Sequence, residues 1–208
     1  LRTKKSRNIN NKRMAPGSRR VRCLALIGKP RSSSHRGQTR KMDPAGEVRT
    51  SGKLEYPMKI SIGADHAGFA LKQQIADALR EEGHQVEDFG TYGTESSDYP
   101  DFAAPVARAV ANGAAERGIV VCASGIGVSI AANKIQGIRA AVAYNFEEVE
   151  LTRRHNDANV IALGAKYTDA DTARQYVKLF LETPFDGGRH ERRVNKMMQL
   201  ENFNPEKQ

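Results

Sequence analysis

Short apolar runs alternate with longer amphipathic segments from residue 58 onward. The apolar runs predict five buried strands, at 58–64, 84–90, 118–122, 138–144 and 158–164. Helical spacing of apolar residues predicts helices over 68–83, 98–113, 127–135, 145–156, 168–184 and 187–201. In the first of these helices, Leu71, Ile75 and Leu79 share one face. The fifth is expected to begin with a cap at Thr168 and to end at Pro184.

This alternation of strands and helices predicts an α/β fold with one parallel sheet. Right-handed crossovers then give a doubly wound, five-stranded, Rossmann-like sheet inside a three-layer α/β/α sandwich. Ligands bind such sheets at the carboxyl ends of the strands, where the strand order reverses. Residues that directly follow a strand are therefore the first candidates for chemistry.

Residues 1–57 differ sharply from the rest of the chain. They hold 16 Lys or Arg against 3 Asp or Glu, a net charge of +13, whereas residues 58–208 hold 17 against 21, a net charge of −4. Few aromatic residues and no apolar period predict a disordered basic extension before a domain at 58–208.

Three explanations of this extension stay open. It could lie upstream of the true start, because the chain begins with Leu and Met58 directly precedes the first strand. It could be an organelle transit peptide, being rich in Arg and Ser. It could be a nucleic-acid-binding arm, although the acidic domain argues against nucleic acid as the main partner.

The two cysteines, Cys23 and Cys122, are too distant to indicate a disulfide framework. We therefore expect a reducing compartment, the cytoplasm, or an organelle if residues 1–57 are a transit peptide. No apolar run approaches the roughly 18 residues of a membrane helix, so we expect no membrane span.

The stretch "IVVCASGIGVSIAANK", residues 119–134, carries the strongest chemical signal. Cys122 ends the most apolar strand, and the glycine-rich loop after it opens a helix, an arrangement that binds anions and stabilises a thiolate. Gly125 and Gly127 are expected to permit unusual dihedrals and close approach of a ligand. The alternative is a buried, inert cysteine. The loop lacks the third glycine of a dinucleotide site, which argues against NAD.

Other candidates are ambiguous one by one. Asp65 and His66 follow the first strand, although Asp65 could simply cap a helix. His155 and Asn156 end a helix, where a histidine often only complements the helix dipole. Taken together with the thiol, these groups suit proton abstraction next to a carbonyl.

A phosphate on the substrate is suggested by Arg189 and Arg193, which lie four residues apart on one helix face. A solvated charged face is the common alternative. No His, Cys or carboxylate cluster has metal-ligand spacing, so we expect no metal. The combined prediction is an enzyme acting on a small sugar phosphate.

Five motifs carry a family resemblance. They are "IGADHAGFALK", "DYPDFA", "CASGIGVSIAANK", "RRHNDANVIALG" and "GGRHERRV", in this order. Together they resemble the type B ribose-5-phosphate isomerase family, which includes the galactose-6-phosphate isomerase subunits. The resemblance covers residues 58–200. It implies interconversion of D-ribose 5-phosphate and D-ribulose 5-phosphate through an enediolate, with no metal or organic cofactor.

The resemblance also implies roles for the glycine-rich loop. Cys122 would be the base that moves the proton between C1 and C2. Another branch of the family uses a Glu at the position of Val128, which cannot act as a base here. The anion hole for the enediolate would comprise Ala123, Ser124, Gly125, Ile126 and Gly127. Ser124 stands where many members have Thr, and its hydroxyl would handle the substrate oxygens.

The remaining roles concern the sugar ring and hydroxyls. His155 would open the ring as an acid, with Asp65 assisting, and Asn156 would hold substrate hydroxyls.

The phosphate would lie on Arg189 and Arg193, with His66 nearby. Lys166 stands where relatives can carry Arg. A lysine keeps the positive charge but cannot bind a ligand through two parallel N–H groups as arginine does. The resemblance further implies a homodimer, or a tetramer, whose active sites are built from two subunits.

Three alternatives to a pentose isomerase remain open. The chain could isomerise a hexose 6-phosphate, such as allose 6-phosphate or galactose 6-phosphate, by the same chemistry. It could bind nucleic acid through residues 1–57. It could sense sugar phosphates without turnover, although Cys122 and His155 argue against this.

Overall fold

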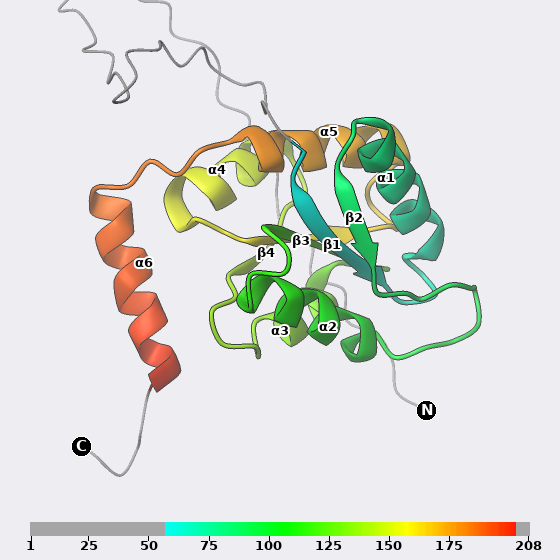
Figure 1. Ribbon diagram of the computed structural model, residues 1–208, viewed down its shortest axis with the longest axis horizontal. Helices are drawn as coiled ribbons and strands as arrows, with labels where there is room; N and C mark the ends of the chain where they lie inside the picture. Colours follow the sequence, from blue (N-terminus) through cyan, green and yellow to red (C-terminus); the bar gives the residue numbers. More distant parts are fainter. Residues whose placement is uncertain (1–56, 203–208) are drawn as a thin grey trace, which may run out of the picture. The chain divides into compact units, whose positions relative to one another are not determined.

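The computed structural model describes residues 57–202, and the expectations for residues 1–56 fall outside that range. Five parallel strands form one sheet in the order β2-β1-β3-β5-β4 (Figure 1). The strands are β1 (Lys59–Ala64), β2 (Gln85–Asp88), β3 (Arg117–Cys122), β4 (Ala140–Val142) and β5 (Val160–Gly164). The helices are α1 (Phe69–Glu81), α2 (Pro100–Ala111), α3 (Ile126–Ala132), α4 (Phe146–Asn156), α5 (Ala170–Glu182) and α6 (Arg189–Gln199), followed by a 3-10 turn, η1 (Leu200–Asn202).

Helices cover both faces of the sheet, which confirms the predicted three-layer fold. On one face, α1, α4 and α5 enclose a core that includes Ile62, Ile161 and Phe180. On the other face, α2 and α3 pack over Val120 of β3 and Val160 of β5 (Figure 1). Strands buried on both faces explain the continuous apolar runs of the sequence.

Several element ends differ from the sequence prediction. The fourth strand is three residues long, because it pairs only with β5 at the edge of the sheet. The side chain of Asn133 accepts from the N–H of Ala140 and donates to its carbonyl oxygen, which fixes the turn before this strand. The cap of α5 is Asp169 rather than Thr168, and its carboxylate accepts the N–H of Thr172 at 3.0 Å.

The carboxyl ends of the three central strands lie side by side. Ala64 pairs with Val121, and Cys122 pairs with Gly164. The strand order reverses between β1 and β3, so residues that follow these strands occupy the expected ligand edge.

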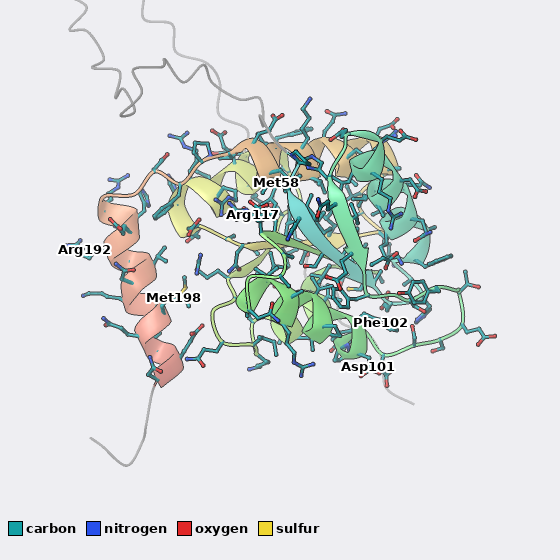
Figure 2. All side chains as sticks on the ribbon, viewed as in Figure 1. Met58, Asp101, Phe102, Arg117, Arg192 and Met198 are labelled. Carbon is teal, nitrogen blue, oxygen red and sulfur yellow. The ribbon has the colours of Figure 1, made fainter. Side chains whose placement is uncertain are left out.

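Helix α4 leads back from this edge to the amino edge of the sheet, where β5 begins at Val160. Helix α6, which follows α5 near the end of the chain, packs against α4. In Figure 2, Met198 of α6 points toward the sheet while Arg192 points away from it, and Met198 Sδ accepts from Arg139 at 3.6 Å. Across residues 57–202, none of the helices combines the length and the apolar character needed to cross a membrane.

Candidate active site

Cys122 lies at the carboxyl end of β3 with only 5% of its surface exposed. The backbone N–H of Gly125 donates to its Sγ at 3.1 Å. Gly125 has a φ of 79°, and a Cβ at this position would stand 3.0 Å from the backbone carbon of Leu163. The prediction of an unusual backbone at Gly125 is confirmed, and this backbone places a donor on the sulfur.

The rest of the loop is equally crowded. The N–H of Ile126 donates to Ser124 Oγ at 3.3 Å. A Cβ on Gly164 would meet the carbonyl oxygen of Ser124 at 2.8 Å. Gly127 lies inside α3 and has no positive φ, so the prediction of an unusual dihedral there is wrong. A Cβ on Gly127 would instead meet the ring of Tyr99 at 2.9 Å, which explains the glycine by close approach.

Asp65 and His66 follow β1 beside this loop. Asp65 is buried, and its Oδ1 accepts the N–H of Gly68 at 3.0 Å just before α1. The N-cap of α1 is Gly68 and no side chain caps this helix, so the suggestion that Asp65 caps it is wrong; Asp65 instead closes the turn before the helix, and its second oxygen is a candidate for substrate.

A loop before α2 holds His66 at two points. The N–H of His66 donates to Ser97 Oγ at 3.1 Å, and the N–H of Ser97 donates to His66 Nδ1 at 3.2 Å. Because Nδ1 accepts a hydrogen bond, the neutral ring carries its proton on Nε2 and can donate it to a ligand oxygen.

Three further residues lie in or beside the glycine-rich loop. Val128 is fully buried in the core, consistent with its exclusion as a base. Lys166 is exposed, and its N–H donates to the carbonyl oxygen of Ala123 at 3.0 Å, which ties the end of β5 to the loop. The Tyr144 hydroxyl donates to the carbonyl oxygen of Ser124 at 3.2 Å.

His155 and Asn156 lie at the opposite edge of the sheet. They end α4, and the carbonyl oxygen of Asn156 accepts from Arg139 Nε at 3.1 Å, just before β4 begins. A five-residue strand such as β5 spans about 13 Å from its first to its last residue. Within one chain, His155 and Cys122 therefore lie near opposite ends of the strands. The structure does not bring them together.

Arg189, Arg193 and His155 form a second cluster at this edge. A hollow of about 270 Å³ is lined by His155, Asn156, His190, Arg193, Val194 and Met197. This volume is below the roughly 300 Å³ at which small-molecule pockets begin, so it suits part of a ligand site. Arg189 begins α6, and its Nε donates to His190 Nε2 at 3.2 Å.

Three possible metal ligands also meet here, which sequence spacing did not indicate. The ligand atoms of His155, Asp186 and His190 lie within 4.8 Å of one another. Arginine N–H groups already engage two of them, Arg189 at His190 Nε2 and Arg154 Nε at the Asp186 carboxylate at 3.1 and 3.2 Å. The positive surroundings suit an anion better than a cation, and the expectation of no metal stays a prediction.

Sequence reasoning missed His190 and Ser97. His190 stands inside the motif that supplied both arginines, so its position beside Arg189 was the available signal. Ser97 lies in an irregular segment, and no periodicity relates it to His66 across 31 residues.

A family model described as Ribose/Galactose Isomerase matches residues 60–197. The chain belongs to this family. A relative named ribose-5-phosphate isomerase B, from Escherichia coli strain K12, is 44% identical over 143 residues, which is 69% of this chain and 96% of that protein. A putative sugar phosphate isomerase of Bacillus subtilis strain 168 is 41% identical over 148 residues, 71% of this chain and 99% of that protein.

Solved structures of family members agree. Ribose-5-phosphate isomerase B of Clostridium thermocellum matches with 52% identity and a TM-score of 0.69, over 70% of this chain and 98% of that chain. Ribose-5-phosphate isomerase B of Mycoplasma genitalium, solved with bound ribulose 5-phosphate, matches with 37% identity and a TM-score of 0.67, over 70% of this chain and 97% of that chain. The family and fold expected from the sequence are both confirmed.

Proposed function

We propose that this family member is an aldose–ketose isomerase that interconverts D-ribose 5-phosphate and D-ribulose 5-phosphate, with Cys122 as its base. The hydrogen bond from Gly125 N–H to Cys122 Sγ carries the proposal, because it aims a donor at the sulfur and stabilises the thiolate that a base requires. Relatives that carry the ribose-5-phosphate isomerase name, one of them solved with ribulose 5-phosphate, support the substrate.

The reaction would begin with ring opening. His155 gives a proton to the ring oxygen, the Asp65 carboxylate accepts the proton of the C1 hydroxyl, and the C1–O bond of the ring breaks, which yields the open aldehyde. The Cys122 thiolate then takes the C2 proton, and the electron pair moves onto the carbonyl oxygen to form the enediolate. Returning that proton to C1, with proton exchange between the two oxygens beside Ser124, completes the ketose.

Each active site would take residues from two subunits of a homodimer. The carboxyl edge of the sheet supplies Cys122. In the same chain, the cluster of Arg189, Arg193 and His155 lies at the opposite edge of the sheet. In this proposal, Arg189 and Arg193 of a second copy lie opposite Cys122, and the separation of His155 from Cys122 within one chain supports it. The tetramer, the cytoplasmic location and the roles of Ala123, Asn156 and Lys166 stay predictions.

The decisive experiment compares wild type with Cys122→Ala. Wild type should interconvert the two pentose phosphates and exchange the C1 proton of ribulose 5-phosphate with D₂O. The Cys122→Ala variant should lose both activities by at least about a thousandfold while keeping its melting temperature. Near-normal exchange would rule out Cys122 as the base. A wild type that prefers allose 6-phosphate in kcat/KM would replace the pentose substrate with a hexose.

A further inference from the structure

The imidazole rings of His155 and His190 are stacked face to face. Their centroids lie 4.1 Å apart and their planes differ by 7°. His155 ends α4 and His190 lies in the first turn of α6, so the stack joins two helices that are separated by α5 in the chain. Because His190 is only 7% exposed, its ring is held in place and limits how the ring of His155 can turn.

His190 also contacts the first residue of the arginine pair. Arg189 Nε donates to His190 Nε2 at 3.2 Å. A guanidinium N–H can donate only to an imidazole nitrogen with a free lone pair. The proton of the neutral ring therefore sits on Nδ1, and protonation of Nε2 would break the contact with Arg189.

The surroundings keep His190 neutral. Burial is the largest effect that lowers the pKa of His190, followed by the charge of His155. Arg189 and Arg193 lower it further, against the opposite effect of Asp186. A neutral ring in this position lets the stacked His155 carry a proton without a like charge 4.1 Å away.

We propose that His190 is a positioning residue that serves two groups at once: it orients the imidazole of His155 for ring opening through the stack, and it holds the Arg189 guanidinium for the substrate phosphate through Nε2. This inference rests on the proposed isomerase function, since it concerns how that reaction is prepared. In this proposal His190 acts through its contacts with His155 and Arg189, and not on the reacting carbons.

Three substitutions separate the two contacts. His190→Phe keeps a flat ring for the stack and loses the acceptor for Arg189. His190→Gln keeps an acceptor and loses the ring, and His190→Ala loses both. His84→Gln is the matched control, because His84 Nδ1 likewise accepts an N–H, from Met58 at 3.1 Å, beside β2 at the far edge of the sheet.

Each variant should show its own kinetic pattern with ribose 5-phosphate. His190→Phe should raise KM about tenfold with kcat within about twofold of wild type, since only phosphate binding weakens. His190→Gln should lower kcat about tenfold with KM nearly unchanged, since only the proton donor is misplaced. His190→Ala should show both effects, and the His84→Gln control neither.

Proton exchange at C1 separates an effect on ring opening from an effect on proton transfer between carbons. Ribulose 5-phosphate is acyclic, so exchange of its C1 proton in D₂O needs the base but no ring opening. At saturating ribulose 5-phosphate, His190→Gln should exchange within about twofold of wild type despite its slow turnover of ribose 5-phosphate. Equal losses in kcat, KM and exchange for all three variants would overturn the proposal, as would wild-type kinetics in His190→Ala.

A spectroscopic measurement keeps this inference distinct from the proposed function. The chain has five histidines, so ¹⁵N-labelled imidazoles can be assigned by single substitutions. His190 should show the Nδ1–H tautomer at pH 7, and His190→Phe should shift the His155 signals less than His190→Gln does. An Nε2–H tautomer in an active wild type would overturn this inference alone, whereas a wild type without isomerisation or exchange would overturn the proposed function and, with it, the role of His190 in ring opening.

Discussion

Lys72 and Asp88 form a buried ion pair that supports the loop leading to the site. Lys72 Nζ lies 2.8 and 2.7 Å from the two carboxylate oxygens of Asp88 and 2.9 Å from the carbonyl oxygen of Thr91. The side chain of Lys72 is 0% exposed and that of Asp88 is 13% exposed. The pair thus joins α1 to the end of β2, from which the chain continues to Ser97 and Tyr99.

Replacing Lys72 with Met should destabilise the protein strongly, because it leaves Asp88 charged and largely buried without its partner. We expect a loss of about 3 kcal/mol in the free energy of unfolding, measured by urea denaturation. The double variant Lys72→Met, Asp88→Asn should recover part of this loss.

The control for Lys72 is an ion pair of the same helix in solvent. Arg80 and Asp77 are 43% and 64% exposed, so Arg80→Met should cost no more than about 0.5 kcal/mol. A Lys72→Met variant as stable as Arg80→Met would show that the buried pair does not hold this part of the fold.

Gly125→Ala should impair both stability and activity. Alanine there must adopt a φ of 79° and place its Cβ 3.0 Å from the backbone carbon of Leu163, so the loop must shift and the donor to Cys122 Sγ must move. We expect a loss of at least about 2 kcal/mol in stability and a fall in kcat of more than about tenfold. Urea denaturation and isomerase assays measure the two effects.

Gly113 provides the matched control, with the same φ of 79° and no atom within 4 Å of an added Cβ. Gly113→Ala therefore reports the dihedral strain alone, which should cost about 1 kcal/mol and leave kcat unchanged. Equal kinetic behaviour of the two alanine variants would show that the position of the Gly125 N–H does not matter to the reaction.

The sequence was sufficient to predict the sheet and its ligand edge. Buried parallel strands are continuous apolar runs, so β3 and β5 were visible without any contact information. The glycine-rich loop after a predicted strand likewise placed Cys122 at the carboxyl end of that strand. The apolar pattern predicts a strand of seven residues at 138–144, whereas β4 has three. The length of an edge strand depends on its pairing with a neighbouring strand, and local sequence pattern does not show which residues pair.

The cluster of His155, Arg189 and Arg193, which is the proposed second half of the site, lies in recognisable motifs, but the local sequence pattern does not place it. Helical periodicity indicates one face for Arg189 and Arg193, yet it does not say against which helix that face packs. The stacked His155 and His190 are 35 residues apart in the sequence. Ser97 and His66, which form hydrogen bonds with each other, are 31 residues apart. Such pairs depend on tertiary packing, which a single sequence does not reveal.

Asp169 should make the stability of α5 depend on pH. Hydrogen bonds from the N–H and hydroxyl of Thr172 lower the pKa of Asp169. A carboxyl whose folded pKa is lowered stabilises the protein above its unfolded pKa of about 3.9, and this contribution disappears as the pH falls through the folded pKa. Asp169→Ala should therefore melt below wild type at pH 7, and the difference should shrink below about pH 4.

Asp169→Asn separates charge from hydrogen bonding, since asparagine caps helices without ionising. Its melting temperature relative to Asp169→Ala should stay constant between pH 7 and pH 3. If the difference between wild type and Asp169→Ala is the same at both pH values, the ionised cap contributes nothing to stability.

Mixing two inactive variants tests whether the site is shared between subunits. Cys122→Ala lacks the proposed base and His155→Asn lacks the proposed ring-opening acid. In a mixed dimer with shared sites, one site receives the intact Cys122 of one chain and the intact His155 of the other, while the second site receives neither. Random re-association makes half of the dimers mixed, each with one active site of two, so about a quarter of wild-type activity should return. Sites confined to single chains would leave the mixture as inactive as its parents, and each parent refolded alone is the control.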